Sequence, residues 1–223
     1  MQQVYHSTAL DLFQDVRPES VDLLLTDPPY RTISGGSGPD PKHKRPKGML
    51  KSNNGRIFAH NDLDFMAWLP LVYSVLKPGS HAYIFTNFLN LEELMISMRS
   101  VGFGVHNLLI WKKNNATPNR WYMKDAEYII FGRKGAAKPI NDCGSKTVLC
   151  FDNVRGKSHP TEKPVDLLEH LIANSTEPGD LVLDPFMGTG SAGVAAKNTG
   201  RSFIGYEIDQ TYFNKAKERL NDL

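Results

Sequence analysis

Short apolar runs alternate along the chain with longer segments in which apolar residues recur every three or four positions. The runs at 21–25 and 181–183 are short enough to be strands buried on both faces of a parallel sheet. Helical spacing of apolar residues marks the segments 165–174 and 191–197. This alternation of strands and helices predicts an open α/β sheet.

The same patterns predict the other elements of the sheet. Further strands are expected at 4–6, 81–86, 105–112, 126–132 and 202–206, and further helices at 9–13, 62–76, 89–100 and 211–220. We expect Asn61 or Asp62 to cap the helix that ends at Leu76, because short polar side chains accept hydrogen bonds from the first free amides of a helix.

The stretch 181–190 combines a strand with a glycine-rich loop. Pro185 ends the strand because it has no amide hydrogen to donate. Gly188 and Gly190 permit positive φ and a close approach of the backbone to a ligand, and Ser191 opens a helix whose free amides face the loop. A small-molecule site is expected here, although a tight strand-to-helix turn would use the same glycines.

An acidic residue ends the next predicted strand. Glu207 lies 23 positions after Asp184, close to the interval of about 20 at which nucleotide-binding units place a carboxylate on a ribose hydroxyl. The spacing favours a nucleotide-type ligand for the loop.

A second motif follows the strand 21–25, which runs directly into Asp27-Pro28-Pro29-Tyr30. Both prolines lack an amide hydrogen and fix φ, so the tetrapeptide is stiff and its carbonyls have few local partners. We interpret it as a segment that presents hydrogen-bond acceptors. A rigid turn at a strand end is the simpler alternative.

Two segments have the composition of a nucleic-acid contact. Residues 31–57 form a basic loop with too little apolar content to pack a core, and 112–122 interleaves basic, amide and aromatic side chains. Their alternatives are a solvated loop and a hairpin with an aromatic packed inward. The candidate DNA-binding residues are Lys42, Lys44, Arg45, Lys47, Lys51, Arg56, Lys113, Asn115, Arg120 and Tyr122.

Composition narrows the class of protein. The net charge of +2 does not demand a polyanionic partner, so a nucleic-acid surface must be local. Cys143 and Cys150 fit neither a metal site nor a disulfide framework, which favours the cytoplasm and no metal. We find no apolar run that would span a bilayer, and the N-terminus lacks the regions of a signal peptide. No membrane association is expected.

The motifs at 27–30 and 184–191 both follow strands, and ligands of open α/β sheets gather at the carboxyl ends of strands. With the hexapeptide 159–164, His-Pro-Thr-Glu-Lys-Pro, they resemble the amino-group (N6-adenine/N4-cytosine) DNA methyltransferases that use S-adenosylmethionine, SAM. The order, with the catalytic tetrapeptide first and the cofactor loop last, is similar to the beta class. The resemblance covers nearly the whole chain.

That resemblance implies a fold and a cofactor site. The fold would be a single Rossmann-like, doubly wound mixed sheet in one methyltransferase domain, 1–223, with permuted motifs. Relatives often carry an acidic residue where this chain has Ser7-Thr8-Ala9, so Thr8 would be a weaker cofactor contact than that residue. The implied SAM-binding residues are Thr8, Ala9, Asp27, Thr161, Lys163, Asp184, Pro185, Phe186, Met187, Gly188, Thr189, Gly190, Ser191 and Glu207.

The resemblance also implies the catalytic residues Asp27, Pro28, Pro29 and Tyr30. Asp27 and the Pro28 carbonyl would accept the two hydrogens of an exocyclic amine, whose lone pair could then face the sulfonium methyl. Tyr30 would stack on the base. The target must be flipped out of a duplex or single-stranded. The sequence has no Pro-Cys motif, which argues against methylation of cytosine carbon 5.

The resemblance implies that a small insertion at 133–157 recognises the target, together with 31–57 and 114–122. It also implies a homodimer. We expect a short DNA sequence to be read and adenine N6 to be methylated; N4-cytosine is the alternative. RNA, a protein amide and a non-catalytic binding module also fit. A restriction-modification partner, a regulatory mark and a phage defence are equally compatible.

Overall fold

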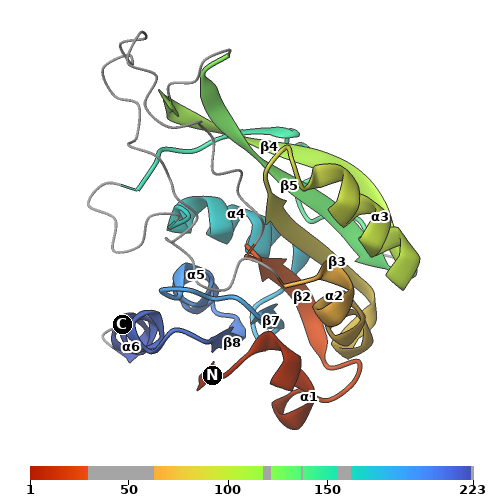
Figure 1. Ribbon diagram of the computed structural model, residues 1–223, viewed down its shortest axis with the longest axis vertical. Helices are drawn as coiled ribbons and strands as arrows, with labels where there is room; N and C mark the ends of the chain where they lie inside the picture. The colour runs from red at the N-terminus through yellow and green to blue at the C-terminus, as the bar shows by residue number, and fades with distance from the viewer. Residues whose placement is uncertain (30–62, 118–121, 137, 155–161, 222–223) are drawn as a thin grey trace, which may run out of the picture.

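The computed structural model describes residues 1–29, 63–117, 122–136, 138–154 and 162–221 (Figure 1). The strands are β1 Gln2–His6, β2 Val21–Thr26, β3 Leu76–Thr86, β4 Phe103–Thr117, β5 Lys124–Lys134, β6 Val148–Cys150, β7 Leu181–Asp184 and β8 Ser202–Glu207. The helices are a 3-10 turn Ala9–Asp11, α1 Leu12–Asp15, α2 Phe65–Val75, α3 Leu91–Val101, α4 Val165–Ser175, α5 Ser191–Asn198 and α6 Gln210–Asn221.

All these strands form one mixed sheet in the order β1-β8-β7-β2-β3-β5-β4-β6. The first five strands of that order are parallel to one another. Strand β5 is antiparallel to both β3 and β4, and β6 returns parallel to β4. The expected α/β class and mixed sheet are confirmed.

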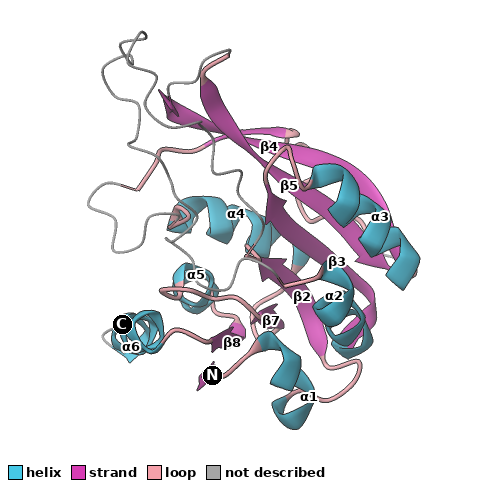
Figure 2. Cartoon of the chain, viewed as in Figure 1, coloured by secondary structure: helices cyan, strands magenta, loops and turns pink. Residues whose placement is uncertain are grey.

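Helices cover both faces of the sheet, as Figure 2 shows. Helices α1, α2 and α3 pack on one face and α4, α5 and α6 on the other. Strand β2 supplies both cores, because Leu24 faces the first and Leu23 and Leu25 face the second. A strand buried on both faces is the reason for the apolar run 21–25.

Both expected ends of helix α2 are wrong. Helix α2 begins at Phe65 and its cap is Asp64, whose Oδ1 accepts a hydrogen bond from the Met66 amide at 2.8 Å. The proposed caps, Asn61 and Asp62, lie outside the described residues. The helix ends one residue early, because Leu76 already pairs with Val21 as part of β3.

Strand β4 is longer than expected and continues through polar residues to Thr117. The cause is pairing: Lys112 lies opposite Ala126 and Thr117 opposite Lys124 on β5, so the backbone is hydrogen-bonded without an apolar run. Much of the segment 112–122 is therefore a long hairpin. No helix in the described part of the chain is both long and apolar enough to cross a membrane.

Candidate active site

The carboxyl ends of three neighbouring strands bring the predicted motifs together. Strand β7 lies between β2 and β8, so Asp184 at the end of β7 has Asp27 on one side and Glu207 on the other. All three strands are parallel, and their ends lie at one edge of the sheet. The two motifs that the sequence separates by more than 150 residues therefore meet there.

Asp184 braces this edge. The Thr26 hydroxyl donates to its Oδ1 at 2.6 Å, and the Phe186 amide donates to the same oxygen at 3.0 Å. Burial raises the pKa of Asp184 to about 7, since the ionised carboxylate is poorly solvated there. The Asp184 side chain joins β2 to the glycine loop. It therefore fixes the position of Thr26, the residue that precedes Asp27.

The glycine loop closes on Glu207. The Gly188 amide donates to Oε2 of Glu207 at 2.9 Å, and the Asp209 amide donates to Oε1 at 2.7 Å. Gly188 and Gly190 have φ of +53° and +80°, as the loop chemistry predicts. A Cβ added to Gly188 would meet no described atom within 4 Å, so that side of the loop is open.

The rest of the loop is held by packing. Met187 and Thr189 are buried, Pro185 lies between them and Asp184, and Ser191 begins α5 with Gly190 as its cap. The Phe186 ring makes an edge contact with the fully buried Trp68 at a centroid distance of 5.1 Å. Helix α2 therefore supports the loop from beneath.

Thr8 and Ala9 lie beside Glu207. They follow β1, which pairs with β8, and the neighbouring Ser7 amide donates to the Glu207 carbonyl at 3.1 Å. The Thr8 hydroxyl accepts from the Leu10 amide at 3.3 Å, and Ala9 is buried. The structure thus brings both residues to the expected edge.

Lys163 forms an ion pair that the sequence did not predict. Its ammonium contacts Oδ2 of Asp27 and lies 3.4 Å from Oε2 of Glu127, while Lys113 pairs with the other oxygen of Glu127. The side chain of Lys163 is only 7% exposed. Lys163 was expected at a cofactor carboxylate and Lys113 at DNA, but both face carboxylates of this chain.

The second oxygen of Asp27 has a different environment. Oδ1 is buried and has no hydrogen-bond partner among the described residues. Burial raises the pKa of Asp27, and the Lys163 ammonium opposes that rise. A buried acceptor without a partner is costly, so the site suits a ligand that donates a hydrogen bond to Oδ1.

Two residues of this site carry no recognisable sequence signal. Glu127 follows Lys-Asp-Ala at the start of β5, where no apolar or polar pattern marks it, and Arg219 is one of several basic residues of α6. Arg219 donates from Nη1 to the carbonyl and hydroxyl oxygens of Thr189 at 3.0 and 3.1 Å, and it pairs with Glu162 at 3.0 Å. Only the folded chain shows that these side chains reach the site.

Some candidates are placed at the hairpin and others are not described. Tyr122 is 92% exposed, and the Asn115 side chain is hydrogen-bonded to Asn153, which follows β6. Tyr30, Thr161 and Arg120 lie outside the described residues, as do Lys42, Lys44, Arg45, Lys47, Lys51 and Arg56.

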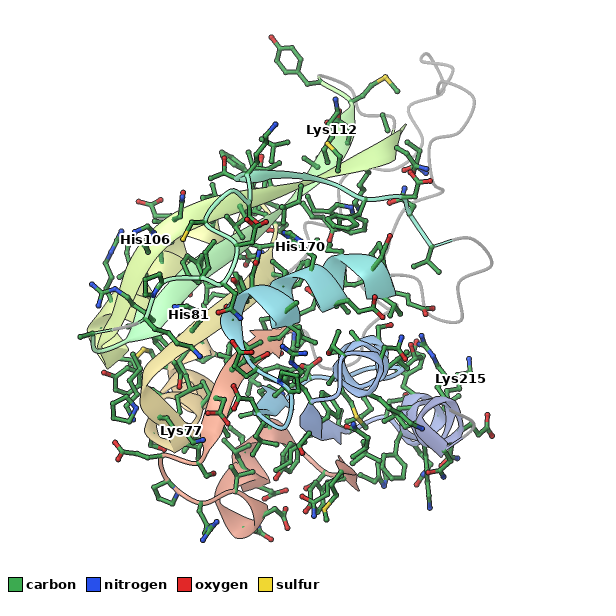
Figure 3. All side chains as sticks on the ribbon, turned by 180° about the vertical axis from the view of Figure 1, so that it is seen from behind. Lys77, His81, His106, Lys112, His170 and Lys215 are labelled. Carbon is green, nitrogen blue, oxygen red and sulfur yellow. The ribbon has the colours of Figure 1, made fainter. Side chains whose placement is uncertain are left out.

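A second hollow lies on the α4 face of the sheet. It has a volume of about 670 Å³ and is lined by residues of β3, β4, β5, α4 and the segment 136–149. Figure 3 shows three of its residues, His81, His106 and His170. Asp27, Lys163 and Glu207 do not line it, so it is separate from the strand-end site.

Comparisons with known proteins agree with this geometry. A DNA methylase family model matches residues 21–147 and 144–218. The type II methyltransferase M2.DpnII of Streptococcus pneumoniae is 30% identical over 250 aligned positions, covering 96% of this chain and 88% of the relative. M2.LlaDCHI of Lactococcus lactis subsp. cremoris, also a type II methyltransferase, is 29% identical over 249, covering 97% and 88%.

Solved structures share the fold. The M1.HpyAVI-SAM complex has a TM-score of 0.75 at 29% identity, covering 99% of this chain and 100% of that chain. The PvuII cytosine-N4-specific DNA methyltransferase has a TM-score of 0.77 at 21% identity, covering 98% and 86%, which bears on the fold alone. On the family match, the shared fold and the order of its motifs, the chain belongs to the N6/N4 DNA methylase family.

Proposed function

We propose that the chain is a SAM-dependent methyltransferase that methylates the exocyclic N6 of adenine in a short DNA sequence. The observation that carries the proposal is the Asp27 carboxylate. One oxygen is paired with a buried lysine, and the other is a buried acceptor without a partner among the described residues. An amino group that donates a hydrogen to Oδ1 would supply that partner.

The cofactor fits the strand-end site. The glycine loop is open at Gly188, Glu207 lies against it, and Thr8 and Ala9 are adjacent. SAM supplies an electrophilic methyl group on a sulfonium. These residues would hold the cofactor by backbone amides and a carboxylate for the ribose hydroxyls. The M1.HpyAVI-SAM complex supports this assignment.

Asp27 and Pro28 act on the target amine. An exocyclic amine is a poor nucleophile because its lone pair is delocalised into the ring. Hydrogen bonds to the Asp27 carboxylate and the Pro28 carbonyl would draw its hydrogens to one side and favour a tetrahedral nitrogen. A paired base cannot reach this geometry, so we propose a flipped-out or single-stranded target, with Tyr30 stacked on it.

We place adenine before cytosine because the tetrapeptide Asp-Pro-Pro-Tyr resembles the adenine enzymes of the family most, although N4-cytosine enzymes share close variants of it. The family also contains N4-cytosine enzymes, and that activity is the second candidate. The type II names of two relatives support a role in restriction-modification. A cytoplasmic location suits a DNA substrate and the two free, exposed cysteines. A homodimer is proposed on the family resemblance.

Mass spectrometry of nucleosides tests the proposal. The protein is incubated with unmethylated DNA and SAM, and the DNA is digested and analysed for modified bases. We expect N6-methyladenine. N4-methylcytosine would keep the mechanism and change the base, whereas cofactor binding without any modified base in duplex or single-stranded DNA would favour a non-catalytic module or another substrate.

Asp27→Ala is the matched control for the mechanism. It removes the acceptor but leaves the glycine loop and Glu207 in place. Methyl transfer should fall at least about a hundredfold, while the dissociation constant for SAM changes little. Near-normal transfer by Asp27→Ala would contradict the assigned role of the carboxylate.

A further inference from the structure

Four charged side chains meet behind the proposed target amine, and each comes from a different element. Lys113 lies on β4, Glu127 on β5, Lys163 just before α4 and Asp27 just after β2. Their side chains are between 7 and 23% exposed. Charges of opposite sign alternate along this series, so the network is neutral as a whole.

Lys163 is the central member of the network. Its ammonium touches Asp27 and lies 3.4 Å from Glu127, and it also lies 5.2 Å from the centre of the Phe85 ring. An ammonium that is shared between two carboxylates stabilises each one less than it would stabilise a single partner. The charge of Glu127 therefore acts on Asp27 through Lys163.

The geometry points to Glu127 as a positioning residue for catalysis. Glu127 orients the Lys163 ammonium so that it holds Oδ2 of Asp27, leaving Oδ1 turned to the target amine, and it limits how strongly Lys163 neutralises the Asp27 carboxylate. Lys113 fixes Glu127 from the opposite side. This inference rests on the proposed function, because it concerns the acceptor that the function requires.

Glu127 and Lys163 should move the proton affinity of Asp27 in opposite directions. The negative charge of Glu127 disfavours a second carboxylate nearby and raises the pKa of Asp27, whereas the ammonium of Lys163 lowers it. Lys113 also lowers it, and Asp184 on β7 is a further charged neighbour among the described residues. The ionised carboxylate of Asp27 is the stronger acceptor for the amine hydrogens, so the pKa of Asp27 sets the acidic limb of the rate profile.

Glu127→Gln and Lys163→Met test the inference. Single-turnover methyl transfer to DNA is measured from pH 5 to 9 at saturating SAM. Relative to the wild type, Glu127→Gln should shift the acidic limb to lower pH and lower the maximal rate about tenfold. Lys163→Met should shift the limb to higher pH. A purely structural role would lower the unfolding temperature of both variants without opposite shifts.

Two further variants complete the test. Glu127→Asp keeps the charge but shortens the reach, so its acidic limb should stay near that of the wild type while its maximal rate falls; it also serves if Glu127→Gln does not fold. Glu93→Gln, an exposed carboxylate on α3, is the control and should match the wild type throughout.

The outcomes separate the two hypotheses. Suppose that the wild type transfers methyl groups, but the acidic limbs of Glu127→Gln and Lys163→Met do not shift or shift in the same direction. This result would overturn the role of Glu127 and leave the proposed function standing. Absence of methyl transfer by the wild type would overturn both.

Discussion

At the scale of single residues, Asp184 shows how a buried carboxyl can stabilise the site through contacts within the protein. Its Oδ1 accepts two hydrogen bonds, from the Thr26 hydroxyl and the Phe186 amide, and burial raises its pKa to about 7. Both bonds need an oxygen acceptor but neither needs a negative charge. Ionisation of Asp184 near neutral pH therefore lowers the free energy of unfolding.

The raised pKa of Asp184 predicts a pH-dependent effect of Asp184→Asn. Between about pH 4 and pH 7 the folded protein binds the Asp184 proton more tightly than the unfolded chain, so the wild-type free energy of unfolding falls as pH rises through this range. Asparagine keeps the acceptor and does not titrate. The variant should gain stability relative to the wild type by on the order of 4 kcal/mol between pH 4 and pH 8.

Urea unfolding at several pH values measures that difference. Thr26→Val is a useful control, because it removes a donor to Asp184 and should destabilise the protein at every pH. A difference between wild type and Asp184→Asn that is constant with pH would show that Asp184 does not titrate in this range.

The sequence predicts a site feature where the type of residue alone determines the local backbone conformation. Gly188 and Gly190 adopt positive φ, and Asp27 presents an acceptor at a strand end, because loop and turn chemistry is local. The partners of Lys163 could not be predicted. Its ammonium contacts Asp27, 136 positions away, and only the order of the strands brings the two together.

At the scale of elements, helix α6 contacts the glycine loop through Arg219. The guanidinium donates to both oxygens of Thr189 and to the Ser191 hydroxyl, and pairs with Glu162 before α4. One side chain thus joins three elements: the loop, the start of α5 and the segment that leads to Lys163. Loss of these Arg219 contacts should increase the mobility of the loop and leave the sheet intact.

Arg219→Met should therefore weaken SAM binding by about tenfold, because several hydrogen bonds that hold the loop in its binding conformation are lost. Calorimetric titration with SAM measures the dissociation constant. Lys217→Met, an exposed position on the same helix, should bind SAM like the wild type. Equal affinity of Arg219→Met and Lys217→Met would mean that α6 does not organise the loop.

Element boundaries followed the apolar pattern where burial decided them and departed from it where pairing did. Strand β2 was predicted well because both of its faces are buried. Strand β4 extends to Thr117 because β5 pairs with it, which no apolar pattern records. The Asp64 cap was missed because Asn61 and Asp62 are equally good cap residues by type.

At the scale of the whole molecule, helix α4 spans the distance between the site and the opposite edge of the sheet. It has 11 residues and is about 16 Å long. Lys163 precedes its first turn and contacts Asp27, whereas Asn141 donates to the carbonyls of Ala173 and Thr176 near its last turn, at 2.8 and 3.1 Å. Asn141, in the proposed recognition segment 133–157, therefore contacts the end of α4 that lies away from Lys163.

Substitutions at two positions of this segment, Asn141 and Asn153, should separate stability from DNA binding. Asn141→Ala should lower the free energy of unfolding by about 1 to 2 kcal/mol and leave the rate of methyl transfer within about twofold of the wild type. Asn153→Ala should weaken DNA binding, because it removes the side-chain amide that donates to Oδ1 of Asn115 at the hairpin. Urea unfolding and the KM for DNA measure the two effects. A large loss of methyl transfer by a folded Asn141→Ala variant would contradict this prediction and would place DNA recognition near Asn141.

The edge contact between Trp68 and Phe186 gives the protein its own optical reporter. Trp68 is 1% exposed, and its indole touches the loop that is proposed to hold SAM. Indole emission depends on the polarity and packing of its surroundings, so any rearrangement of the loop will change the fluorescence of an unlabelled sample. Binding and release of the cofactor could then be followed in stopped-flow experiments, with Trp68→Phe identifying the signal.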